Sequence, residues 1–208
     1  MVSWESLVFF TGASLLLAAT PGPDILYVLT RGLAQGRRAA IAATLGFVCC
    51  TMVHTSFAMI GLSALIKASV TGFLILKIVG AIYLIYLGIR MFIDKASFEL
   101  SNQGKPSEIK RIFLQSFFAG SLNPKVAIFF LAFLPQFISA DRGMVWMQFL
   151  ELGIIFMIVT LIMFTLAGLC AAQIGSILKR NRKIASGMRF GAGSILCSLG
   201  IGLVLNDS

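Results

Sequence analysis

Two short motifs place opposite charges inside long apolar stretches of this sequence. Residues 20–24 read Thr-Pro-Gly-Pro-Asp, and residues 120–125 read Gly-Ser-Leu-Asn-Pro-Lys. Charged side chains at membrane depth are costly and usually functional. A free amino acid carries the complementary charges, so Asp24 offers a partner for an ammonium group, or a protonatable site, and Lys125 offers a partner for a carboxylate. A structural ion pair between Asp24 and Lys125 is the alternative, and both roles can hold at once.

The prolines of both motifs predict breaks in the helices that carry them. A proline inside a helix removes a backbone hydrogen bond and clashes with the preceding turn, and the freed backbone groups must line protein or a wet cavity. Asparagine suits an N-cap and proline the first helical position. We therefore expect new half-helices from Asn123-Pro124 to Phe137 and from Gly22-Pro23 to Leu29, whose positive N-terminal ends add partners for a carboxylate. The predicted substrate-binding residues are Pro21, Gly22, Pro23, Asp24, Asn123, Pro124 and Lys125.

The elements that must position these motifs are transmembrane helices. Hydrophobic residues make up 58% of the 208, charged residues 12%, and the mean hydropathy is +0.95, whereas a soluble domain carries about 25% charged residues. The chain therefore lacks the polar surface that a soluble globule needs. A spanning helix takes about 20 mainly apolar residues, and six stretches predict an all-α polytopic membrane protein. They are Glu5–Leu29, Ala40–Ile66, Val70–Phe92, Ile112–Phe137, Val145–Leu178 and Ile184–Leu205.

Lysine and arginine residues in the connections predict the orientation. Thirteen of them lie in or beside the first, third and fifth connections, and only Lys67 and Arg142 lie in the second and fourth. Because basic loops stay in the cytoplasm, we expect both termini outside a bacterial inner membrane, with membrane lipids as partners. The net charge of +9 then reflects topology, and we expect no nucleic-acid partner. By residue count, Asp24 lies in the cytoplasmic half of its span and Lys125 near the middle.

The chain is predicted to form a single membrane domain, residues 1–208, built from two repeats. Residues 1–93 and 112–208 each hold three helices, and the polar segment 94–111 joins them as a cytoplasmic linker. Three spans in each half put the halves in opposite orientations, and each half begins with a broken helix. Inverted repeats with discontinuous helices are typical of secondary transporters.

Four motifs occur in order along nearly the whole chain. They are the Pro-Gly-Pro-Asp of residues 21–24, residues 36–40 with 45–46, residues 80–88, and residues 123–125 with 135–137. Together they resemble the lysine exporter/RhtB family of amino acid exporters. The resemblance implies homodimers and efflux of neutral or basic amino acids, such as threonine, homoserine, leucine or lysine, driven by the proton-motive force. The aspartate after the second proline is most similar to the threonine-exporter branch. An acidic residue expected from the family midway along the fifth helix is absent.

Four further side chains are candidates for lining the pocket or for coupling: His54, Tyr83, Glu151 and Thr160. Thr160 lies near the depth of the missing acidic residue, and Glu151 lies closer to the outer end. Histidine as a residue type titrates near neutrality, so His54 is a candidate pocket-lining or proton-relay residue, although an interhelical hydrogen bond explains it equally. Tyr83 is also compatible with packing. Cys50 lies one turn before His54, but a fourth ligand is lacking, so we expect neither a metal site nor a cofactor.

These observations predict a secondary active transporter that exports amino acids from the cytoplasm by proton antiport, and not an enzyme. Two alternatives stay open. A divalent-cation exporter of the same broad fold needs more intramembrane carboxylates than Asp24 and Glu151. A membrane thiol–disulfide electron carrier needs paired reactive cysteines, and the pair Cys49 and Cys50 has no counterpart on the fifth helix.

Overall fold

A computed structural model describes residues 1–20, 22–68, 70–93, 107–171, 173 and 182–205. Every regular element within these residues is helical. The elements are α1 (Trp4–Ala19), α2 (Pro23–Gln35), α3 (Arg37–Ala68), α4 (Val70–Ile93), α5 (Ile109–Ser121), α6 (Pro124–Ile128), the π-helical η2 (Phe129–Phe133), the 3₁₀ turns η3 (Leu134–Phe137) and η4 (Ala140–Arg142), α7 (Val145–Leu169) and α9 (Arg182–Leu205).

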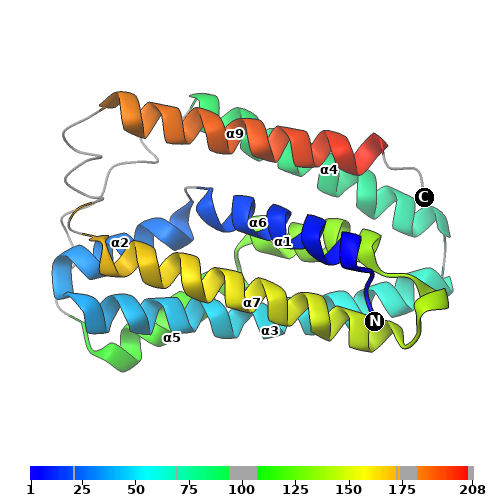
Figure 1. Cartoon of the computed structure of the whole chain (residues 1–208), viewed down its shortest axis with the longest axis horizontal. Coiled ribbons are helices and arrows are strands. Elements are labelled where there is room, and N and C mark those ends of the chain that lie inside the picture. The colour runs from blue at the N-terminus through cyan, green and yellow to red at the C-terminus, as the bar shows by residue number, and fades with distance from the viewer. Residues whose placement is uncertain (21, 69, 94–106, 172, 174–181, 206–208) are drawn as a thin grey trace.

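The helices run roughly along one long axis (Figure 1). Helices α4 and α9 lie together along one side, α1 and α6 run through the middle, and α3, α5 and α7 lie on the other side. Direct packing joins α4 to α9, α3 to both α5 and α7, and α1 to α7. Helix α1 begins and α9 ends at the same end of the molecule, which is the arrangement that termini on one membrane face require.

Two single helices are long and apolar enough to cross a membrane: residues 37–61 of α3, and α7. Two bent pairs also qualify when each pair is counted as one span. Helices α1 and α2 meet at 55°, and α5 meets the half-helix formed by α6, η2 and η3 at 47°. The described residues therefore hold up to four spans by length and composition, and these include both predicted broken helices. The prediction of six spans counts α4 and α9 as well.

The first connection is much shorter than the sequence pattern suggested. The half-helix expected to end at Leu29 continues to Gln35, and Gly36 alone separates it from α3. Gly36 has a φ of +78°, a left-handed conformation that glycine adopts without steric cost. Arg31 therefore lies on α2, where its guanidinium group donates hydrogen bonds to the side chains of Gln35 and Gln115.

The predicted end of the fifth helix was also wrong. Helix α7 ends at Leu169 with Cys170 as its C-cap, nine residues before the predicted end at Leu178. The backbone N–H of Cys170 donates to the carbonyls of Leu166 and Gly168, which closes the last turn. Residues 174–181, and residues 94–106 of the linker predicted at 94–111, lie outside the described part of the chain. Residues 109–111 of that linker belong to α5.

Glycines set the close approach of α3 to α5. A Cβ atom on Gly46 would overlap the side chain of Ser116 and the backbone of Phe113, and a Cβ atom on Gly120 would overlap the sulfur of Cys50. Small residues at such crossings allow helix backbones to pack closely inside a membrane. The second broken helix is thereby fixed against α3 directly before its break.

The half-helix after the second break is irregular. Residues 124–128 are α-helical, 129–133 form a π turn, and 134–137 a 3₁₀ turn. Pro135 cannot donate a backbone hydrogen bond, and a proline disturbs the turn that precedes it. Phenylalanine rings fill the space around this segment: Phe129 stacks on Phe133 with centroids 4.9 Å apart, and Phe130 meets Phe156 of α7 edge to face at 5.0 Å.

Candidate functional site

The first break lies between α1 and α2 and ends in a buried carboxylate. Thr20 is extended, and its N–H donates to the carbonyls of Leu16 and Leu17. Gly22 is also extended, and Pro23 takes the first position of α2, as predicted. Asp24 follows in the first turn and is only 5% exposed. Pro21 lies outside the described residues.

The second break is capped by its own side chain. Helix α5 ends at Ser121, and Asn123 accepts a hydrogen bond from the backbone N–H of Lys125 at 3.0 Å. Pro124 takes the first helical position. The prediction that Asn123 and Pro124 begin a new half-helix is confirmed. Lys125, in the first turn, is 8% exposed.

The two breaks meet inside the protein. The ammonium nitrogen of Lys125 lies 3.6 Å from Oδ2 of Asp24, and the side-chain amide of Asn123 donates to Oδ1 of the same carboxylate. Lys125 Nζ also lies 3.5 Å from the carbonyl oxygens of Leu17 and Thr20. These carbonyls end α1, where the helix dipole is negative. The ion pair anticipated from the sequence is therefore present, although a residue count had placed the two charges at different depths.

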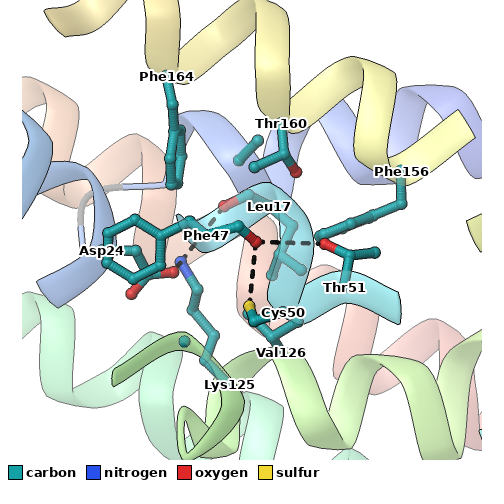
Figure 2. A pocket seen from close by; sticks show the side chains of 12 residues that line it. Leu17, Asp24, Phe47, Cys50, Thr51, Lys125, Val126, Phe156, Thr160 and Phe164 are labelled. Carbon is teal, nitrogen blue, oxygen red and sulfur yellow. Dashed lines mark hydrogen bonds and ion pairs between the residues drawn. The ribbon is translucent and has the colours of Figure 1, made fainter. Parts of the chain in front are cut away.

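A cavity lies against this ion pair (Figure 2). Its walls come from α1, α2, α3, α7 and both sides of the second break. The space is narrow, with room for about one water molecule. The lining residues are Leu17, Ala18, Asp24, Phe47, Cys50, Thr51, Gly120, Lys125, Val126, Phe156, Thr160 and Phe164.

Of the four secondary candidates, only Thr160 lines the cavity. His54 lies behind its wall, with Nε2 3.0 Å from the carbonyl oxygen of Gly120. Tyr83 lies on α4 with its ring 6.0 Å from that of Tyr86. Glu151 lies near the first residues of the chain, where it accepts a hydrogen bond from the backbone N–H of Val2 at 3.1 Å.

Most of the residues that line the cavity were not predicted from the sequence, although several of them recur at helical spacing. Phe156, Thr160 and Phe164 recur every four residues on α7, so they share one face. Phe47 and Thr51 have the same spacing on α3. In helices this apolar, nothing in the pattern separates a face that lines a cavity from a face that meets lipid.

The described residues contain no group of three or more histidine, cysteine, aspartate or glutamate side chains that could hold a metal ion. The cysteine nearest the ion pair, Cys50, is buried, and its thiol donates to the carbonyl of Phe47 at 3.0 Å. Neighbouring Cys49 is a free thiol as well. The cavity is thus built from one carboxylate, one ammonium, hydroxyls, a thiol and phenylalanine rings.

Comparison with known proteins identifies the family. Residues 15–207 match the family model described as LysE type translocator. The chain belongs to the LysE type translocator family. Its relatives include the homoserine/homoserine lactone efflux protein of Salmonella typhimurium, which is 29% identical over 82% of each chain. An uncharacterized membrane protein of Vibrio cholerae is 29% identical over 89% of this chain and 93% of its own.

Membership settles the class of protein. LysE type translocators are transporters and not enzymes, so the cavity belongs to a transport protein. A Bacillus subtilis membrane protein, YrhP, is 33% identical over 66% of this chain and 70% of its own. No solved structure matches the chain. The sequence-based resemblance to this family is confirmed, together with a role in amino acid efflux at the level of the family.

Proposed function

We propose that this translocator is a secondary active exporter of neutral amino acids, and that the substrate binds where the two helix breaks meet. The observation that carries this proposal is the buried pair of Asp24 and Lys125 beside a cavity. Buried ion pairs stabilise a fold poorly compared with apolar residues of similar volume. A pair that lines a cavity is better explained by a ligand that exchanges with it.

The chemistry of the pair matches the main-chain groups of an amino acid. The substrate carboxylate takes the place of Asp24 beside Lys125, and the substrate ammonium group takes the place of Lys125 beside Asp24. Neither buried charge is left without a partner during this exchange, which avoids the large cost of an uncompensated ion. Asn123 holds the Asp24 carboxylate in place while the lysine turns away.

The charge balance of the cavity favours a neutral substrate. Asp24 is the single acidic residue among the lining residues, and Lys125 is the single basic one. A substrate with a second ammonium group, such as lysine, would bury that charge without a carboxylate. The same count argues against divalent cations, since hard cations take several oxygen ligands.

Asp24 is also the proposed coupling site. It is the lining carboxylate, whereas His54 lies behind the wall and Glu151 near the N-terminus. A carboxylate that binds either a proton or the substrate ammonium, but not both, couples their movements in opposite directions. When Asp24 is protonated, the carbonyls of Leu17 and Thr20 still face the lysine ammonium group.

The packing supports two inverted repeats that move against each other. If α1, α2, α3 and α4 correspond to α5, the α6–η3 half-helix, α7 and α9, then some of the main contacts have counterparts in the other half. Helix α3 packs on α5 as α7 packs on α1, and α2 packs on α7 as η2 packs on α3. Because each half contributes one member of the ion pair, rocking of the halves would open the narrow cavity to one side at a time. The inner-membrane location, outside termini and homodimer stay predictions.

A transport assay tests this proposal. Inside-out membrane vesicles containing the protein are given a panel of radiolabelled amino acids, with and without an acidic lumen. We expect accumulation of neutral amino acids that depends on the pH gradient and is absent from vesicles lacking the protein. Accumulation of lysine in preference to all neutral amino acids would contradict the charge argument. Accumulation that does not respond to the gradient would contradict proton antiport.

A further inference from the structure

We propose that the hydroxyl group of Thr160 binds the side-chain hydroxyl of the substrate, so that the transporter selects short hydroxylated amino acids such as threonine and homoserine. This inference rests on the proposed function and specifies its substrate class. Thr160 is 4% exposed, lines the cavity, and its Oγ1 has no hydrogen-bond partner. A buried hydroxyl without a partner costs free energy. A ligand that supplies the missing hydrogen bond removes this cost.

The conformation of Thr160 differs from that of its equivalents elsewhere in the chain. Serine and threonine in helices usually donate to the carbonyl four residues before them. Many hydroxyls here do so, including those of Thr11, Ser14, Thr20, Thr55 and Ser121. The corresponding bond of Thr160 would go to Phe156, and it is absent. The local helical partner therefore does not satisfy this hydroxyl.

The polar groups around the cavity are arranged to match a substrate of this shape once the cavity opens. In Figure 2 the side chains of Asp24 and Lys125 lie on one side of the view, and the oxygens of Thr51 and Thr160 lie on the other. Thr51 contributes a further hydroxyl, which makes only a long 3.4 Å bond to the carbonyl of Phe47. A substrate whose main chain binds the charged pair thus directs its side chain towards hydroxyl groups.

The rings that border the cavity limit the length of the side chain. Phe47, Phe156 and Phe164 all line it, and each is at most 5% exposed. Long or branched apolar side chains would have to displace these packed rings. A pocket that is purely apolar discriminates weakly against an added hydroxyl, but a hydroxyl-bearing pocket discriminates against a substrate that leaves it unpaired.

The test measures the ratio of kcat/KM for two substrates that differ in one group. Transport by purified protein in liposomes is measured separately for labelled threonine and valine, and for labelled homoserine and norvaline. The two members of each pair are nearly isosteric, and their kcat/KM values are compared. We expect the wild type to favour the hydroxylated member by about tenfold in kcat/KM, as one hydrogen bond allows. Thr160→Val should bring both ratios close to one, and Thr160→Ser should keep them.

Thr44 provides a matched control. Its hydroxyl is also buried without a hydrogen-bond partner, but it does not line the cavity, so Thr44→Val should leave both ratios unchanged. If Thr160→Val lowers transport of both members of a pair equally, or changes neither, the inference is overturned. If the wild type transports valine and threonine equally well, the inference fails while the proposed function stands. If it transports no amino acid, the proposed function itself fails.

Discussion

The two helix breaks have related sequences, yet they are stabilised in different ways. The second break caps itself, since Asn123 accepts the N–H of Lys125 and Pro124 begins the helix. The first has no side-chain cap, because Gly22 occupies the N-cap position of α2. Its carboxylate, Asp24, is instead held by two side chains from the second break, Asn123 and Lys125.

This difference indicates a division of roles between the halves. The second break is a complete local structure that reaches across to the first, and the first depends on that contact. A movement that separates the halves therefore leaves α6 capped but releases the carboxylate. In an exporter, such a release would expose Asp24 to solvent, protons and substrate at the moment when the site opens.

Breaking the contact between the two halves should have the largest effect. Asp24→Asn and Lys125→Ala each leave a buried partner unmatched, which typically costs about 3–5 kcal/mol. We expect each variant to reduce efflux more than about a hundredfold, while the protein still inserts into the membrane. Efflux from loaded cells and the amount of protein in membranes measure the two properties. Lys110→Ala, which removes an exposed lysine of α5, is the control and should export normally.

A double variant separates binding from simple pairing. Asp24→Asn combined with Lys125→Met removes both charges and should recover thermal stability relative to either single variant, because no unpaired ion remains. Efflux should stay absent, since the main-chain charges of the substrate have lost their partners. Recovery of efflux together with stability would make the pair purely structural.

The next largest effect distinguishes the capped break from the uncapped one. Asn123→Ala removes the cap of α6 and the bond to Asp24, so we expect a loss of about 1–2 kcal/mol in stability and a clear drop in efflux. Gly22→Ala should leave stability nearly unchanged, because its extended backbone accepts any residue. The new methyl group would lie 3.1 Å from Lys125 Nζ and should raise KM severalfold.

Thermal unfolding in detergent and transport kinetics measure these two variants. Gly12→Ala is the control for Gly22→Ala, because a Cβ atom there would meet nothing within 4 Å; it should change neither property. Asn123→Asp keeps an oxygen for the cap but places a second carboxylate beside Asp24, so it should retain stability better than Asn123→Ala and still transport poorly. Equal destabilisation by Gly22→Ala and Asn123→Ala would contradict the division of roles.

Both breaks were predictable from sequence because their signals are local. Proline and asparagine act on the backbone within one turn, so the starts of both half-helices at Pro23 and Pro124 were predicted correctly. The meeting of Asp24 and Lys125 was harder to predict. Residue count predicts the depth of a Cα atom. The long lysine side chain places its ammonium group several ångströms from that Cα atom, so Lys125 reaches Asp24 although the count had put the two residues at different depths.

The cavity walls form where segments distant in the sequence pack together, so local sequence patterns did not predict them. Phe47 and Phe164 become neighbours only when α3 and α7 pack together, with centroids 5.7 Å apart. The contact of Glu151 with Val2 joins residues 149 positions apart. A solitary acidic residue in an apolar helix looks functional wherever it lies, so Glu151 was a candidate for coupling even though its sequence position lies closer to the outer end of its helix.

The smallest expected effect therefore concerns Glu151, and it tests where the proton binds. Glu151→Gln keeps an oxygen that can accept the N–H of Val2, so we expect efflux within about twofold of wild type and an unchanged dependence on external pH. Asp24→Glu keeps a carboxylate at the ion pair but moves it by one methylene group, so it should alter the pH dependence of whatever efflux remains. Efflux measured across a series of imposed pH gradients compares the two variants. If Glu151→Gln removes the pH dependence and Asp24→Glu does not, the proton is carried near the chain terminus and not between the two breaks.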